Sequence, residues 1–175
     1  ENILMDEFLF PKITDFGLSK INDSIAESLN TTSQSGYKGT LLYTSPEVFE
    51  GCSCSEKSDV YALALIVYQI MTGITPFKQL NTFNLMNKIK NAERPVITND
   101  VPPVYRILIE SCWEQDPNDR PTFDEILDVL KKEPKYITET VHEGEFIEYC
   151  EAIEEYQSSF NLSKNRIKFK DFLKN

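Results

Sequence analysis

The feature that most constrains the fold is an apolar run from Val60 to Met71, with the sequence VYALALIVYQIM. A membrane-spanning helix needs ~20 apolar residues, and this run of about 12 is interrupted by Gln69. We therefore interpret it as a helix buried on nearly all sides in a globular core. Ser58-Asp59 is expected to cap its start, and Thr72-Gly73 is expected to end it.

Composition excludes several classes of protein. A chain of 175 residues with 41% hydrophobic residues can form one domain with a sizeable core, or a domain with an appendage. The formal net charge of -10 would repel nucleic acid and anionic lipid, so neither nucleic acid nor membrane is expected as a partner. Cys52, Cys54, Cys112 and Cys150 form no C-x-x-C pair and accompany a single histidine, His142. This pattern lacks zinc spacing and favours reduced thiols in a cytoplasmic protein.

The first part of the chain predicts a small β-hairpin and then a long loop. The runs Ile3–Met5 and Phe10–Thr14 flank a turn at Asp6-Glu7. Residues 18–44 are rich in hydroxyl groups and poor in large apolar groups, so they are either a functional loop or a plain surface excursion. Because the chain begins with Glu1 and not with Met, we expect it to be a piece of a longer protein.

The region from Ser45 to Leu130 has helical patterns throughout. Ser45-Pro46 provides a cap and a proline suited to a first helical position. Further helices are predicted around residues 83–89, 104–113 and 122–130. The side chains expected to face inward from the last two are Ile107, Leu108, Cys112, Phe123, Ile126, Leu127 and Leu130. The sequence therefore predicts a mainly α-helical lobe.

The composition changes again after Pro134. Residues 143–160 predict a helix with one acidic and one aromatic-aliphatic face. This helix either packs against the lobe or docks on another domain. Residues 161–175 are expected to form a second short helix or to begin a further module.

Asp15 is the first candidate for chemistry. Its carboxylate follows a predicted strand, Phe16 can pack beside it, and Gly17 permits unusual backbone angles. Asn2 lies on the other side of the predicted hairpin, from which its amide oxygen could reach the same ion. Oxygen ligands of this kind suit magnesium beside phosphate. Taken singly, Asp15 could equally be a loop carboxylate and Asn2 a turn or cap residue.

Four motifs that follow one another in a fixed order favour the metal-ligand interpretation of Asp15 and Asn2. They are KITDFGLSK at 12–20, GTLLYTSPE at 39–47, SDVYA at 58–62 and CWEQDPNDRPTF at 112–123. With these motifs the chain resembles the C-terminal lobe of a eukaryotic protein kinase, and within that family the tyrosine-kinase-like group. The resemblance implies a mainly α lobe with a short β-hairpin that carries the Asn and Asp-Phe-Gly motifs. It also implies that residues 1–132 are this lobe and that 133–175 are a helical extension or the start of a next module.

The resemblance assigns site roles by position. Asn2 and Asp15 match the family's magnesium ligands, so the implied cofactors are ATP and Mg²⁺. Leu4 matches the leucine under the adenine ring, and Thr40 matches the threonine near the acceptor hydroxyl. Residues 15–47 match the activation segment. Within it, the residues expected to be phosphorylated are Ser28, Thr31, Thr32, Ser33 and Ser35.

Other matches imply structural roles. Phe16 and Gly17 belong to the Asp-Phe-Gly motif, and Phe16 would join the internal column that registers the active state. Glu47 and Arg120 match a buried ion pair. Asp59 matches an aspartate that hydrogen-bonds the backbone of the catalytic loop. Ile66 and Ile70 would support the column beneath adenine.

The resemblance also implies that parts of the family's catalytic machinery lie outside the 175 residues. The Gly-rich loop, the strand lysine and the general-base aspartate of the family would all precede Asn2, so the segment alone is expected to be inactive. The leading hypothesis is a signal-transducing Ser/Thr kinase that acts on protein hydroxyls and has its N-lobe in the full-length chain. The alternative is a pseudokinase or scaffold lobe that binds proteins, and a third class is an unrelated helical interaction module.

Overall fold

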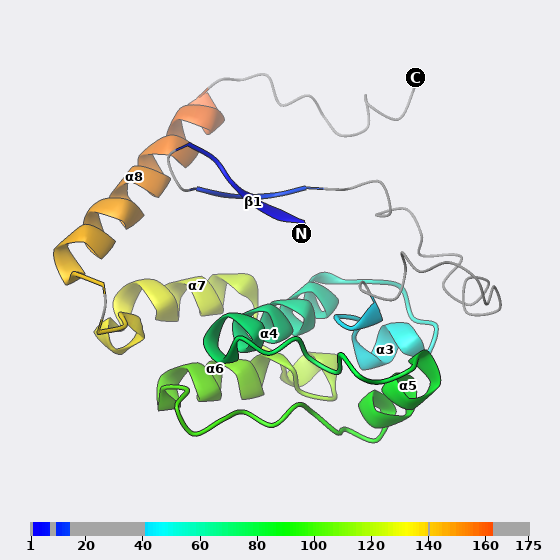
Figure 1. The fold of residues 1–175 in the computed structure, drawn as a ribbon. Helices are drawn as coiled ribbons and strands as arrows, with labels where there is room; N and C mark the ends of the chain where they lie inside the picture. The colour runs from blue at the N-terminus through cyan, green and yellow to red at the C-terminus, as the bar shows by residue number, and fades with distance from the viewer. Residues whose placement is uncertain (1, 8–9, 15–40, 140, 163–175) are drawn as a thin grey trace, which may run out of the picture. The chain divides into compact units, whose positions relative to one another are not determined.

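The computed structural model describes residues 2–7, 10–14, 41–139 and 141–162. The chain divides into two compact units, one of residues 1–14 with 137–175 and the other of residues 15–136. Figure 1 labels β1 and the α-helices, and each unit is described by itself below.

The first unit contains the predicted hairpin and a long helix. Strand β1 (Ile3–Met5) pairs antiparallel with β2 (Pro11–Ile13), with Ile3 opposite Ile13. Asp6 closes the turn, because its carboxylate accepts the Phe10 N–H at 2.9 Å and its own N–H donates to the Phe10 carbonyl at 3.1 Å. Helix α8 (Glu143–Leu162) covers the predicted helix of residues 143–160. Hairpin and helix are both confirmed.

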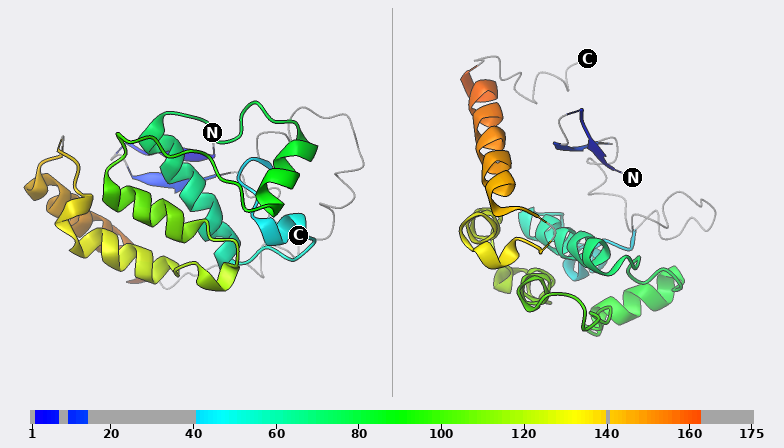
Figure 2. Two further views of the ribbon diagram at one scale, coloured as in Figure 1. Left: turned by 90° about the horizontal axis from the view of Figure 1, so that it is seen from below. Right: turned by 60° about the vertical axis from the view of Figure 1, so that its left-hand side comes forward.

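The second unit is a set of helices, which Figure 2 shows from two directions. The α-helices are α3 (Pro46–Phe49), α4 (Glu56–Thr72), α5 (Thr82–Lys90), α6 (Pro103–Cys112) and α7 (Phe123–Lys132). Two short 3-10 helices follow α6 and α7, namely η3 (Pro117–Asp119) and η4 (Pro134–Tyr136). The described chain is therefore mainly α with one small two-stranded antiparallel sheet, as predicted.

Helix α4 begins earlier than the sequence suggested. Its N-cap is Ser55, and the Ser58 hydroxyl accepts the Ser55 N–H at 3.1 Å, so Ser58 lies inside the first turn. The prediction that Ser58-Asp59 caps the helix was wrong, because the N-cap is Ser55. Ser58 is the third helical residue and forms a capping box with Ser55. The predicted end is confirmed, since Gly73 adopts a left-handed φ of 69°.

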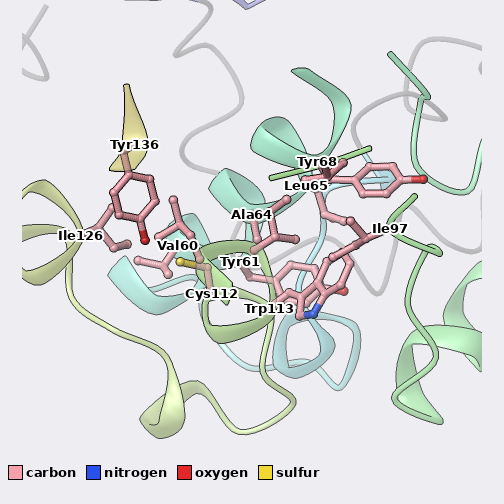
Figure 3. Close-up of a cluster of buried hydrophobic side chains, with 13 residues drawn as sticks. Val60, Tyr61, Ala64, Leu65, Tyr68, Ile97, Cys112, Trp113, Ile126 and Tyr136 are labelled. Atoms are coloured by element: carbon pink, nitrogen blue, oxygen red, sulfur yellow. The ribbon is translucent and has the colours of Figure 1, made fainter. Parts of the chain in front are cut away.

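The core of the second unit is built around α4. Val60, Tyr61 and Leu65 are fully buried, and α4 packs along α6 through Ile109 and Cys112. Figure 3 shows Val60, Tyr61, Leu65 and Cys112 in one cluster with Trp113, Ile126 and Tyr136.

Not every face predicted to be buried is buried. Ile70 of α4 is 73% exposed and Ile107 of α6 is 64% exposed, while Phe123 and Leu127 of α7 are also exposed. Within residues 60–71 of α4, Ile70 alone is exposed and the other residues are buried or half-buried, so the prediction that α4 is buried on nearly all sides holds except at Ile70. The reason is that α6 packs along one face of α4, and a second apolar face needs a second neighbour.

Among the described residues, none of the helices combines the length and the hydropathy that crossing a bilayer requires.

Gly73 and Gly144 form a matched pair for testing the end of α4. Nothing lies within 4 Å of a methyl group added at either position, but only Gly73 has a positive φ, at 69°. We expect Gly73→Ala to lower the free energy of unfolding by about 1–2 kcal/mol, because an L side chain is strained there. Gly144→Ala should leave stability unchanged or raise it by up to about 1 kcal/mol. Urea denaturation measures both; equal effects would contradict the left-handed cap.

Candidate active site

Asn2 is held across the hairpin from the residue that precedes Asp15. The Thr14 N–H donates to the Asn2 carbonyl at 2.9 Å, which extends the ladder one pair beyond Ile3 and Ile13. Thr14 is followed directly by Asp15 in the sequence. The backbone pairing therefore sets Asn2 opposite Thr14, the residue that precedes the Asp-Phe-Gly motif in the sequence.

The chemistry of these two residues suits magnesium. The Asn2 side chain is exposed, so its amide oxygen is open to a ligand. An amide oxygen and a carboxylate are hard ligands of the kind that Mg²⁺ takes, with phosphate oxygens and water completing the coordination. The residues present thus fit the metal. Leu4, the predicted adenine contact, is 55% exposed and pairs with Lys12 across the hairpin.

Several predicted site residues lie outside the described residues. They are Asp15, Phe16, Gly17, Ser28, Thr31, Thr32, Ser33, Ser35 and Thr40. Their roles remain predictions.

Glu47 and Arg120 form a bidentate ion pair between the start of α3 and the end of η3. Arg120 Nη1 lies 2.9 Å from Glu47 Oε1, and Nη2 lies 2.8 Å from Oε2. The Arg120 side chain is fully buried, and that of Glu47 is 12% exposed. Burial alone would raise the pKa of Glu47, but hydrogen bonds, chiefly from Arg120, outweigh it and lower the pKa to about 2.

The remaining donors of Arg120 are also satisfied. Its Nε donates to the Glu114 carbonyl at 2.8 Å and its Nη1 to the Lys57 carbonyl at 2.8 Å. The guanidinium also lies 5.1 Å from the centre of the Tyr61 ring. Arg120 therefore joins three segments of the second unit, those of α3, α4 and the loop after α6.

Two interactions beside this pair were not predicted from the sequence, that of Ser58 with Glu47 and that of Arg94 with the segment after α6. Ser58 donates to Glu47 Oε1 at 3.0 Å, and Arg94 donates to the Trp113 carbonyl from Nε at 3.0 Å and from Nη2 at 2.9 Å. Arg94 also lies 5.2 Å from the centre of the Tyr61 ring, so that ring contacts two guanidinium groups. Nothing in the local sequence signals Arg94, because its partners lie about 20 residues away, at 113 and 115.

Asp59 lies in the first turn of α4 and is exposed. Burial of part of the carboxylate raises its pKa, and the neighbouring charge of Glu56 raises it further. The role that the resemblance implies for Asp59, a hydrogen bond to the backbone of the catalytic loop, also remains a prediction.

The segment that follows Thr40 is attached to α4. The Tyr43 hydroxyl donates to Gln69 Oε1 at 2.5 Å, and Ser45 is buried. This contact and the Glu47–Arg120 pair secure both ends of residues 43–47. The chain just after the predicted acceptor site is thus held by the helical unit.

Comparison with known proteins agrees with this geometry. The family described as "Protein tyrosine and serine/threonine kinase" matches residues 1–130. A probable serine/threonine-protein kinase of Dictyostelium discoideum is 37% identical over 134 residues, which are 77% of this chain and 14% of the relative. A probable LIM domain-containing serine/threonine-protein kinase of the same organism is 35% identical over 137 residues, with 78% of this chain and 20% of the relative covered.

A third relative carries a different specificity in its name. Dual specificity protein kinase shkC of Dictyostelium discoideum is 39% identical over 132 residues, which are 74% of this chain and 25% of that protein. The chain thus spans between 14% and 25% of the length of these three curated relatives. Because the family matches residues 1–130 in one continuous stretch, this chain belongs to the protein kinase family.

Proposed function

We propose that the chain is the C-terminal lobe of a serine/threonine protein kinase that transfers the γ-phosphate of ATP to protein hydroxyls. The observation that supports this most is the Thr14 to Asn2 hydrogen bond of 2.9 Å, because it sets an amide ligand opposite the residue before Asp15. The names of two relatives, both probable serine/threonine kinases, support the same acceptor class.

In this proposal Asn2 and Asp15 bind magnesium, and Leu4 contacts adenine. Magnesium bound to ATP neutralises the charge on the phosphates and orients them for in-line transfer. Thr40 lies near the acceptor hydroxyl. The general-base aspartate, the strand lysine and the Gly-rich loop come from the full-length protein, so the 175-residue segment alone does not catalyse.

The proposal also covers the regulation of the chain, its domain bounds and its place in the cell. Residues 15–47 are the activation segment, and phosphorylation within 28–35 regulates it. Residues 1–132 are the lobe, in the tyrosine-kinase-like group, and 133–175 are an extension. The full-length protein acts in the cytoplasm in signal transduction, with protein substrates as its partners.

The test is a phosphorylation assay on the full-length protein. We expect incorporation of phosphate from ATP into a protein acceptor with Mg²⁺ and none with EDTA in its place. Phosphoamino-acid analysis should find phosphoserine and phosphothreonine. Phosphotyrosine beside them would instead favour the dual specificity that shkC carries in its name. Absence of transfer together with retained protein binding would establish the pseudokinase alternative.

A further inference from the structure

The hairpin that carries Asn2 has almost no core of its own. Each strand has only three residues, and every strand residue except Lys12 is exposed. Two-stranded hairpins of this size are marginally stable in water. Something beyond the ladder must therefore hold the hairpin in register.

Helix α8, which belongs to the same unit, supplies such a contact. The ring of Phe10 lies 5.6 Å from the ring of Tyr149 and 5.6 Å from the ring of Tyr156, tilted at 56° and 54°. These separations and angles are those of favourable aromatic pairs. Tyr149 and Tyr156 are seven residues apart, which is two turns, so they lie on one face of the helix. Phe10 bridges that face.

Lys12 adds a polar contact from β2. Its ammonium donates to the Tyr156 hydroxyl at 3.1 Å, lies 4.2 Å from the centre of the Tyr156 ring, and pairs with Asp6 at 3.4 Å. The hydrogen bond to Tyr156 raises the pKa of Lys12, so the ammonium remains charged. Lys12 is also the half-buried residue of the strand that leads to Thr14 and Asp15.

We propose that α8 is a positioning element of the kinase, which holds the hairpin through Phe10 and Lys12 and thereby keeps Asn2 paired with Thr14, the residue that precedes the Asp-Phe-Gly motif in the sequence. The helix begins at Glu143, beyond the family match at residues 1–130. A segment outside the matched domain would thus support the nucleotide site. The effect on nucleotide use rests on the proposed function, whereas the effect on the hairpin does not.

The experiment compares variants of α8 in the full-length protein. Tyr156→Ala removes the ring and the hydroxyl while keeping a good helix former. Tyr156→Phe keeps the ring and removes only the acceptor for Lys12. Ile147→Ala is the matched control, since Ile147 is 50% exposed and lies nine residues before Tyr156, on the opposite face of α8.

Hydrogen exchange of peptides covering residues 10–14 reports on the hairpin directly, because the Thr14 amide is bonded to Asn2. We expect Tyr156→Ala to speed this exchange and to raise KM for Mg·ATP by roughly 2–30-fold. Tyr156→Phe should give a smaller change, and Ile147→Ala should behave as wild type.

Unchanged exchange in Tyr156→Ala would overturn the proposal, because the hairpin would then be held without α8. Faster exchange with an unaltered KM would overturn the positioning role. A wild-type protein that transfers no phosphate would defeat the proposed kinase function instead, and the exchange contrast would still decide whether α8 holds the hairpin.

Discussion

Replacing Asp15 by Asn should reduce phosphoryl transfer by the full-length protein by roughly 10²–10³-fold, the range seen when one preorganised electrostatic contact to a transition state is removed. The substitution keeps the shape of the side chain and removes the charge that the proposed magnesium ion needs. The measurement is kcat with a protein acceptor at saturating ATP, repeated over a range of Mg²⁺ concentrations.

Asp124→Asn is the control for this variant. Asp124 lies exposed in the first turn of α7, so loss of its charge changes the net charge equally without touching the hairpin. The control should retain wild-type kcat. Equal activity of Asp15→Asn and wild type would remove the role proposed for Asp15, whichever acceptor is used.

Arg120→Leu should lower the free energy of unfolding by ~3–5 kcal/mol, because it leaves the largely buried Glu47 carboxylate without its partner. The substitution also removes the donors to the Glu114 and Lys57 carbonyls. Denaturation by urea or heat measures the loss, and a loss of this size can exhaust the stability of a domain.

Lys132→Leu is the matched control for the ion pair. Lys132 pairs with Asp128 four residues earlier on α7, with both side chains more than half exposed at 70% and 58%. Exposed helix pairs of this kind contribute ~0.3–0.5 kcal/mol. If Arg120→Leu were no more costly than Lys132→Leu, the buried pair would not hold this unit together.

The ion pair of Glu47 with Arg120 also makes the stability of the fold depend on pH. The pKa of Glu47 is about 2 in the folded chain, below its ordinary value of 4.5. A depressed carboxyl pKa stabilises the fold above the unfolded value, and that stability is lost as pH falls toward the folded value. The contribution of the pair should therefore be complete above about pH 4.5 and disappear toward about pH 2. Glu47→Gln should remove this part of the acid dependence.

The helices and the hairpin could be predicted because their signals are local. The apolar run at 60–71, the prolines at 46 and 103 and the glycine at 73 each act on the backbone within one or two turns. The burial of individual side chains could be predicted less well than the helices and the hairpin. Ile70 and Ile107 have apolar side chains at helical spacing, yet both are exposed, because exposure depends on which other segment lies against that face.

Some interactions at the candidate site can likewise be predicted from local sequence, and others cannot. Asn2 and Asp15 are predicted as ligands from their motif and order, and the pairing of Asn2 with Thr14 follows from a short hairpin. Arg94 could not be found, because its side chain binds the carbonyl of Trp113, and no residue near it in the sequence reveals that partner.

By itself, the sequence determined that this chain is a mainly α kinase segment with a hairpin at its start, because ordered motifs and short-range periodicity can be recognised in the sequence alone. Only the tertiary structure decided that Arg120 is fully buried with five donated hydrogen bonds and that Phe10 contacts Tyr149 and Tyr156. Those contacts join residues between 5 and 146 positions apart. Folding creates them by packing whole elements together, and no local preference of the chain encodes them.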